Sequence, residues 1–134
     1  MISYRLGNDV DLDACIDVYR SSTLGEHRPV DDREVMRAMF AAANLVVSAW
    51  DGDRLVGVAR SLTDFVFCTY LSDLAVRLEY QRQGIGKELI RRTQKAGKSA
   101  TIFLFAAPAA VAYYERLGLT PGSGWLMTPM KRLR

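Results

Sequence analysis

The stretch AVRLEYQRQGIGKELIRR, residues 75–92, runs from apolar residues through two closely spaced glycines into a basic pattern with helical spacing. Gly84 and Gly86 lack side chains that would block an approaching ligand, and Arg82 and Lys87 add positive charge beside them. Backbone N–H groups at a helix start, together with the positive end of the helix dipole, bind phosphate oxygens. The stretch therefore favours a loop that meets an anion, followed by a helix.

Two familiar phosphate-binding loops do not fit this stretch. A Walker A loop would need a glycine at Gln81 and a hydroxyl residue at Glu88, and a dinucleotide fingerprint would need its third glycine at Leu89. A G-x-G pattern before a helix is also typical of a tight turn. From these residues alone, a phosphate cradle and a simple turn both stay open.

Patterns on both sides of the glycine loop predict alternating strands and helices. Asp51-Gly52 between two β-rich runs indicates a hairpin, and the apolar run 100–107 is typical of a buried strand. The predicted order is β-α-α-β-β-β-α-β-α-β, with antiparallel hairpins first and a parallel crossover around the loop. We expect strands at 2–7, on both sides of residues 51–54, and at 68–76, 100–107 and 124–133, and helices after Asp11, after Asp31 or Asp32, and over 85–96 and 109–117.

Length and composition predict one globular domain, residues 1–134. No apolar run approaches the about 18 residues that a membrane span needs, and the N-terminus lacks a signal-peptide pattern. Cys15 and Cys68 are too few and too far apart for a disulfide scaffold or zinc site, so we expect small apolar residues in or near the core. These features predict a cytoplasmic protein with no membrane partner, and a lone histidine, His27, argues against a metal centre or a Ser-His-Asp triad.

The net charge of +3 hides an asymmetry between the two halves of the chain. Residues 1–73 hold 7 Lys and Arg against 12 Asp and Glu, and residues 74–134 hold 11 against 3. The basic half suits a polyanion such as a phosphorylated cofactor or nucleic acid, although a solvated basic surface has the same composition. Because its aromatic residues fall within apolar patterns, we do not expect a nucleic-acid partner.

Two motifs give a more specific interpretation. VRLEYQRQGIGKELI resembles the acyl-CoA loop of the GNAT N-acetyltransferase superfamily, whose pattern is V-x-x-x-x-[QR]-x-x-G-x-[GA]. AAVAYYERLGL, residues 109–119, resembles the later A-x-x-[FL]-Y-E-[KR]-L-G-F block of the same family, with Leu119 in place of the usual aromatic. The resemblance covers nearly the whole chain, although the first 44 residues match by element order more than by motif.

The resemblance implies a mixed, largely antiparallel sheet with a splayed parallel strand pair, flanked by helices. It also implies transfer of an acetyl group from acetyl-CoA, as cosubstrate and without a metal, directly to a primary amine. The pantetheine arm would add to the strand edge at Leu74 to Val76, and the pyrophosphate would sit on the backbone N–H groups of Arg82 to Lys87. The implied cofactor-binding residues are Leu74, Ala75, Val76, Gln81, Arg82, Gln83, Gly84, Ile85, Gly86, Lys87 and Tyr114.

The catalytic residues follow from the same resemblance. Tyr114 takes the motif position of the general acid that protonates the departing thiolate, and a phenol with a pKa of about 10 stays protonated at neutral pH. Tyr113 is the second candidate for the general acid. The alternative role for Tyr114 is packing on the sheet. The candidates for the general base are Asp73, Glu26 and its neighbour His27. The alternative is a buried hydrogen-bonding role for Asp73 and a solvated loop position for Glu26 and His27. Ordered water could also accept the proton.

Some features stay open. Ala107 stands where the family often has an asparagine that bonds the pantetheine arm. A non-catalytic acyl-CoA-binding or sensing domain is the alternative function, with Tyr114 arguing against it. The acceptor is a small amine or a protein amine; acidic residues of the first half suit a cationic amine, whereas Arg28 suits a carboxylate. A homodimer is also open, because dimers are common among similar proteins.

Overall fold

The structure, a computed structural model, describes residues 1–134. Five strands form one sheet, with four α-helices and three short 3-10 helices around it. None of the helices is long and apolar enough to cross a membrane. The strands are β1 (Ile2–Leu6), β2 (Leu45–Asp51), β3 (Arg54–Thr63), β4 (Cys68–Val76) and β5 (Thr101–Phe103); the helices are α1 (Leu12–Ser21), η1 (Thr23–His27), α2 (Arg33–Ala42), η2 (Leu78–Tyr80), α3 (Ile85–Ala96), η3 (Pro108–Ala110) and α4 (Val111–Arg116).

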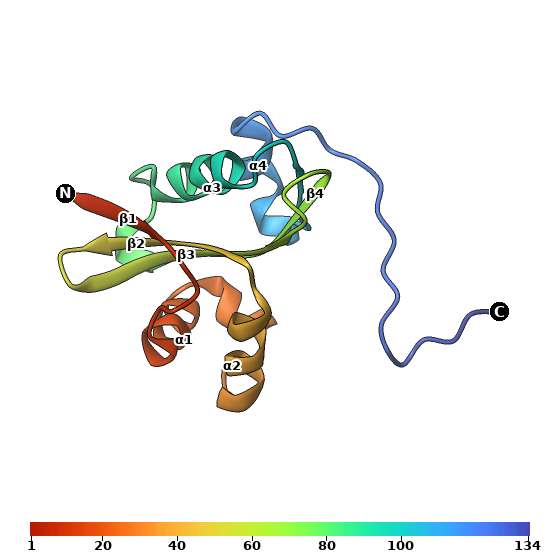
Figure 1. The fold of residues 1–134 in the computed structure, drawn as a ribbon, viewed down its shortest axis with the longest axis horizontal. Coiled ribbons are helices and arrows are strands. Elements are labelled where there is room, and N and C mark those ends of the chain that lie inside the picture. Colours follow the sequence, from red (N-terminus) through yellow and green to blue (C-terminus); the bar gives the residue numbers. More distant parts are fainter.

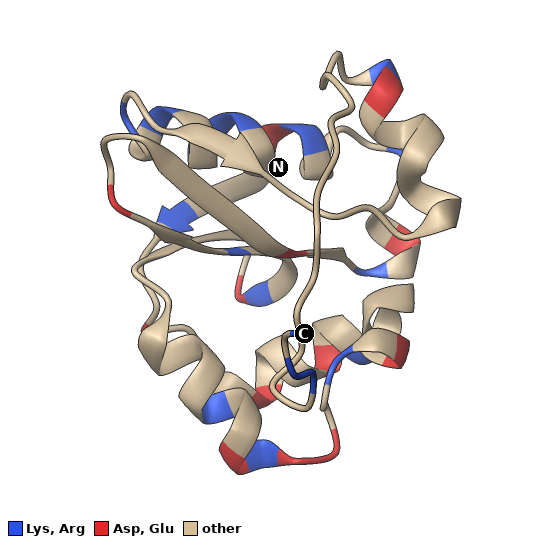
Figure 2. Ribbon diagram, turned by 90° about the vertical axis from the view of Figure 1, so that its right-hand side faces the viewer, with Lys and Arg blue, Asp and Glu red and all other residues tan.

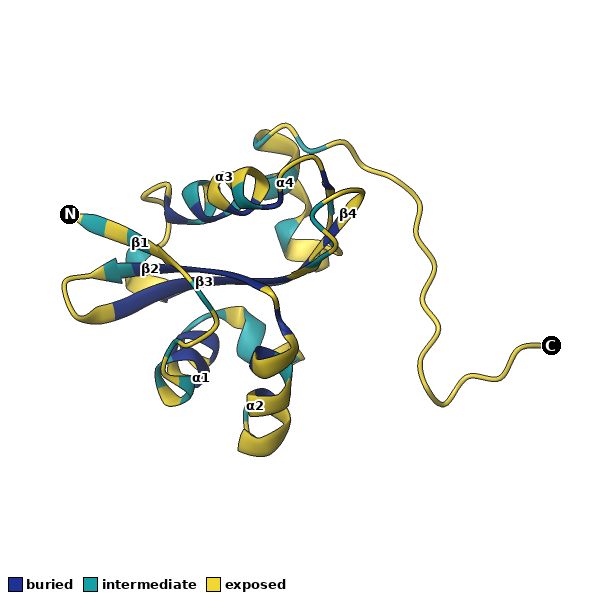
Figure 3. Cartoon of the chain, viewed as in Figure 1, coloured by how far each residue is buried: buried dark blue, intermediate teal, exposed yellow.

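The sheet has the order β1-β2-β3-β4-β5. The first three pairs are antiparallel, and β4 pairs with β5 in parallel, with α3 as the crossover between them. Helices α1 and α2 cover one face, and α3 and α4 lie on the other (Figure 1). Strands β2 and β3 are buried between these layers (Figure 3). The predicted mixed sheet and its parallel crossover are confirmed.

The helices begin where the sequence places their caps. The side chain of Asp11 accepts a hydrogen bond from the Ala14 amide at 2.9 Å, and Asp32 does the same for Val35 at 3.2 Å. Helices α1, α2 and α3 each bury one apolar stripe: α1 and α2 form one core with the sheet, and α3 forms a second core on the opposite face. The segment between α1 and α2 contains the short helix η1.

A β-bulge in β4 shapes the centre of the molecule. Leu71 pairs with Ser61 and Asp73 pairs with Arg60, so Ser72 is an extra residue with no partner in β3. Strand β5 pairs only with Cys68–Tyr70, just before this bulge. A bulge bends its strand, and from Leu71 onward β4 has no neighbour on its β5 side. The splayed parallel pair implied by the resemblance is confirmed.

Two arginines hold the bulge in place around the fully buried carboxylate of Asp73. Arg60 Nε and Arg28 Nε each lie 2.6 Å from its oxygens, and the Tyr19 hydroxyl donates to it at 2.7 Å. The Ser72 carbonyl accepts from Arg28 Nη2 at 2.7 Å. Burial alone would raise the pKa of Asp73, but the bonds and charges of these partners outweigh it and lower the pKa below its ordinary value.

Three expectations about peripheral segments are wrong. No strand forms over 124–133; the end of the chain extends away from the body (Figure 1) and pairs with no strand of the sheet. Strand β5 is shorter than the predicted 100–107 and is not buried, since it is the edge of the sheet. Cys68 is exposed at the start of β4 and is not a core residue, whereas Cys15 is buried.

Replacing Asp73 with asparagine is expected to lower the free energy of unfolding by about 3–5 kcal/mol, because Arg60 then stays buried without its counter-charge. Urea unfolding at neutral pH measures the loss. Asp31→Asn is the matched control, since Asp31 pairs with Arg20 on the surface, and it should leave the midpoint unchanged. A midpoint for Asp73→Asn equal to that of the wild type would contradict the prediction.

The same pair of proteins gives a pH test. The folded-state pKa of Asp73 lies below 3.8, so its carboxylate stabilises the fold above that pH and loses this effect as the pH falls toward the folded-state pKa. The difference in unfolding free energy between wild type and Asp73→Asn should be full at about pH 5–7 and narrow below 3.8. A difference that does not change with pH would show that the Asp73 carboxylate is not the source.

Candidate active site

The larger cleft, with a volume of about 730 Å³, passes through the sheet where β4 leaves β5. On the α3 and α4 side it is lined by the glycine loop and by both tyrosines of α4. On the α1 and α2 side it is lined by the segment around η1. Leu71, Ser72, Leu74 and Val76 of β4 connect the two ends. The cleft therefore has lining residues from both sides of the sheet, and β4 lies between them.

The edge of β4 that faces this cleft carries free backbone groups. The Arg77 amide donates to the Val56 carbonyl at 2.9 Å on the β3 side. Because hydrogen bonding alternates along an antiparallel pair, the backbone groups of Leu74 and Val76 point to the other, open side. The side chain of Gln81 donates to the Val76 carbonyl at 2.9 Å, which leaves the Leu74 groups and the Val76 amide available to an extended ligand.

The glycine loop begins α3 without a side-chain cap. Gly84 is the N-cap residue and has a φ of 83°, and Arg82 has a φ of 65°, so two loop residues are left-handed. The Gly84 carbonyl accepts from the Glu88 amide at 3.1 Å, which starts the helix. The amides of the first turn therefore have no intrahelical partner. They belong to residues that line the cleft, so they are available to bind an anion there.

Tyr113 explains why position 86 is glycine. A Cβ built on Gly86 would lie 2.5 Å from the Tyr113 hydroxyl oxygen and 3.5 Å from Cζ of the same ring. The phenol thus lies against the first turn of α3, beside the glycine loop. Burial raises the pKa of Tyr113 above its ordinary value of 10.0, so the hydroxyl stays protonated at neutral pH.

Tyr114 packs edge-on against Tyr113, with ring centroids 5.3 Å apart, and also lines the cleft. Burial, and then the neighbouring Tyr113, raise the pKa of Tyr114 above 10.0. The hydroxyl of Tyr113 is directed toward the glycine loop, so Tyr114 is the tyrosine of α4 that is free for another role. A protonated phenol in a cleft can donate a proton to a departing anion.

The two carboxylates considered as general base do not lie in the cleft. Asp73 is fully buried among Arg60, Arg28 and Tyr19, and its lowered pKa makes it a weak proton acceptor. The structure therefore supports its alternative role as a buried hydrogen-bonding residue. Glu26 is exposed on η1 and does not line the cleft, whereas its neighbour His27 does.

Most of the residues expected to bind cofactor are brought together. Leu74, Val76, Gln81, Arg82, Gly84, Ile85, Gly86, Lys87 and Tyr114 all line the cleft. Ala75 and Gln83 do not: Ala75 points into the core and Gln83 donates to the Glu79 carbonyl at 3.4 Å. Sequence reasoning missed the wall formed by Ser22, Thr23, Leu24, Leu71, Ser72 and Phe105, because no local motif marks residues that only the topology brings together.

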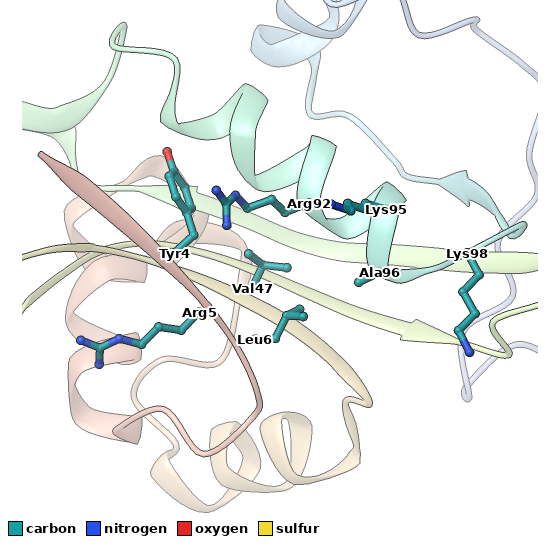
Figure 4. A pocket seen from close by; sticks show the side chains of 8 residues that line it. All are labelled: Tyr4, Arg5, Leu6, Val47, Arg92, Lys95, Ala96 and Lys98. Atoms are coloured by element: carbon teal, nitrogen blue, oxygen red, sulfur yellow. The ribbon is translucent and has the colours of Figure 1, made fainter.

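A second hollow, of about 470 Å³, lies between β1 and the C-terminal half of α3 (Figure 4). Arg92 lies over the ring of Tyr4 at 4.5 Å, and Lys95 and Lys98 also line it. It contains neither the glycine loop nor the tyrosines of α4, so we place the candidate active site in the larger cleft. No group of three His, Cys, Asp or Glu side chains in the structure could hold a metal ion.

The sequence model of the family described as "Acetyltransferase (GNAT) domain" matches residues 18–131. The chain therefore belongs to the GNAT acetyltransferase family. An uncharacterized N-acetyltransferase (ycf52-like) of Prochlorococcus marinus is 32% identical over 109 residues, covering 76% of this chain and 56% of that protein. A histone acetyltransferase of Glycine max is 40% identical over 68 residues, covering 48% of this chain and 29% of that protein. The chain thus spans about half the length, or less, of these relatives.

Solved structures share the fold over almost the full chain. A GNAT-family acetyltransferase from Streptococcus pneumoniae has a TM-score of 0.77 at 23% identity and covers 98% of this chain and 100% of its own. An aminoglycoside N-acetyltransferase in complex with CoA has a TM-score of 0.76 at 14% identity and covers 98% and 96%. At this identity the likeness establishes the fold, and the function rests on the cleft itself.

The contact between Gly86 and Tyr113 predicts coupled mutations. Gly86→Ala alone should destabilise the protein, because the new Cβ meets the Tyr113 hydroxyl. In a Tyr113→Phe background the nearest ring atom lies at 3.5 Å, and the same change should gain from the better helix propensity of alanine. We expect a coupling energy of about 0.5–3 kcal/mol from urea unfolding of the four proteins. Additive effects would rule out the contact.

Proposed function

We propose that this chain transfers an acetyl group from acetyl-CoA to a primary amine. The observation that carries the proposal is the meeting of three features in one cleft of a GNAT family member: the open edge of β4, the uncapped start of α3, and the phenol of Tyr114. An acyl-CoA needs a partner for its extended arm, a site for its pyrophosphate and a proton for its departing sulfur. The cleft offers one feature for each.

The charges of the cleft support the same cosubstrate. Arg82, Lys87 and Arg116 line it, and further Lys and Arg residues lie along α3 (Figure 2). CoA carries a pyrophosphate and a 3′-phosphate, which such a surface attracts. Ala107 lines the cleft but has no side-chain amide, so it cannot form the hydrogen bond that the family's asparagine makes to the pantetheine arm. The free backbone groups of Leu74 and Val76 would hold the arm instead.

The chemistry is a direct transfer. The amine nitrogen attacks the thioester carbonyl carbon, and the electron pair of the C=O bond moves to the oxygen, where an amide of the open β4 edge donates a hydrogen bond. The C–S bond then breaks, and the thiolate takes the proton of the Tyr114 hydroxyl, which solvent restores. The proton of the amine leaves to His27, the histidine that lines the acceptor end, or to water.

Binding and turnover can be tested separately. Titration calorimetry with acetyl-CoA should show saturable binding, and thiol release across a panel of amines should show turnover. Binding without thiol release for any amine would support the non-catalytic acyl-CoA-binding alternative. If neither binding nor release is seen, the proposal is wrong.

Tyr114→Phe is expected to lower kcat by about a hundredfold or more while leaving the dissociation constant for acetyl-CoA nearly unchanged. The pKa of Tyr114 is raised above 10.0, so its acid form persists at pH 7–9 and the wild type should show no loss of kcat from this group over that interval. Tyr113→Phe is the matched control and should retain most of the turnover. Equal kcat values for wild type and Tyr114→Phe would remove the assignment.

A further inference from the structure

The acceptor end of the cleft has an unusual charge composition. It is formed by the segment 22–28 and by Leu71 and Ser72 of β4, on the opposite side of the sheet from the glycine loop. Its side chains are neutral except for the guanidinium of Arg28, with His27 beside it. No Asp or Glu lines any part of the cleft, although residues 1–73 contain 12 of them.

The nearby carboxylates are already engaged or turned away. Asp73 lies beneath the floor but is held by both Arg60 and Arg28, so the three groups together carry a net charge of +1. Asp17 pairs with Arg77 at 2.6 Å. Glu26 lies outside the lining. The acceptor end therefore has a positive charge that no acidic side chain of the cleft balances.

Arg28 can still bind a ligand. A guanidinium has five N–H donors in a planar fork. Arg28 uses three of them, on Asp73 Oδ1 at 2.6 Å, the Ser72 carbonyl at 2.7 Å and the His27 carbonyl at 2.8 Å. Its side chain is 24% exposed and lines the cleft. Two donors on the terminal nitrogens are therefore left, and the bonds to the bulge fix their position before any ligand arrives.

From this geometry we propose that the acceptor is a small amine that also carries a carboxylate, with the carboxylate bound by the remaining N–H donors of Arg28. The inference rests on the proposed acetyl transfer and names its substrate class. Arginine is well suited to carboxylate because its fork matches the two oxygens. An acceptor with several ammonium groups, such as an aminoglycoside, would bring positive charge toward Arg28 with no carboxylate of the cleft to receive it.

The test compares amines that differ only in this group. Thiol release is measured for α-amino acids and ω-amino acids against their own amides, with spermidine and kanamycin as polycationic amines. We expect kcat/KM for the carboxylates to exceed that for the matched amides by tenfold or more, with the polycations poorest. A preference for amides or polycations would overturn the inference. Where turnover is too slow, calorimetric binding of the same pairs in the presence of CoA gives the same comparison.

Arg28→Gln should reduce the ratio between carboxylate and amide to near one, mainly through KM for the acceptor, while the KM for acetyl-CoA stays within about twofold. Arg20→Gln is the matched control: Arg20 also tethers this region, through the Val30 carbonyl and Asp31, but does not line the cleft. Its ratio should equal that of the wild type. An unchanged ratio in Arg28→Gln would overturn the role of Arg28. The wild-type panel decides the substrate class even if Arg28→Gln does not fold.

The two proposals fail in different ways. If wild-type protein releases thiol with some amine but shows no preference for carboxylates, acetyl transfer stands and the acceptor class is wrong. If no amine is acetylated and neither series binds better than the other in the presence of CoA, both are wrong. Acetyl-CoA binding with preferential binding of the carboxylates, but without turnover, would keep the acceptor end as a carboxylate site and reject catalysis.

Discussion

The bulge at Ser72, held by two arginines around Asp73, is the constraint on which the site depends. A straight β4 would continue to pair with β5, and the cleft between them would close. The extra residue leaves a carbonyl without a partner in β3, and Arg28 satisfies it at 2.7 Å while also binding Asp73. The same bulge directs Asp73 into one core, and Leu74 and Val76 line the cleft on the opposite side.

Burying a carboxylate between two guanidiniums adds little net stability, because the free energy of removing the charges from water usually offsets much of their mutual attraction. Apolar residues of similar size could fill the same volume, but they would not bond the Ser72 carbonyl or fix which residue is extra. We interpret the cluster as a device that sets the register of β4. Because register decides which backbone amides face outward, it also decides which groups meet the acyl carrier.

The parts of the fold and of the site that could be predicted from the sequence are those that depend on residues close together in the chain. The glycine loop, the hairpin at Asp51-Gly52 and the caps of α1 and α2 each depend on residues within a few positions of one another. The role of Asp73 could not be predicted, because its partners Tyr19, Arg28 and Arg60 lie 54, 45 and 13 residues away in sequence. The strand expected at 124–133 had a strand-like composition, but a strand also needs a neighbour, which composition does not reveal. Whether Glu26 or His27 lines the cleft depends on the directions of their side chains on η1, which the sequence does not reveal.

Arg28 connects the two ends of the cleft mechanically as well as electrostatically. It belongs to the segment that forms the acceptor end, yet its Nε and Nη2 bind Asp73 and Ser72, the residues that set the edge of β4. The carboxylate of an amine substrate, bound to the remaining donors of Arg28, would therefore contact the same guanidinium that holds the bulge. Since the backbone groups of Leu74 and Val76 follow the bulge directly, a correctly bound acceptor and a correctly aligned thioester would favour the same position of β4. In such an arrangement the bound acceptor and the bound acyl donor favour one another through β4, whereas binding of acetyl-CoA alone rests on the edge of β4 and on the glycine loop.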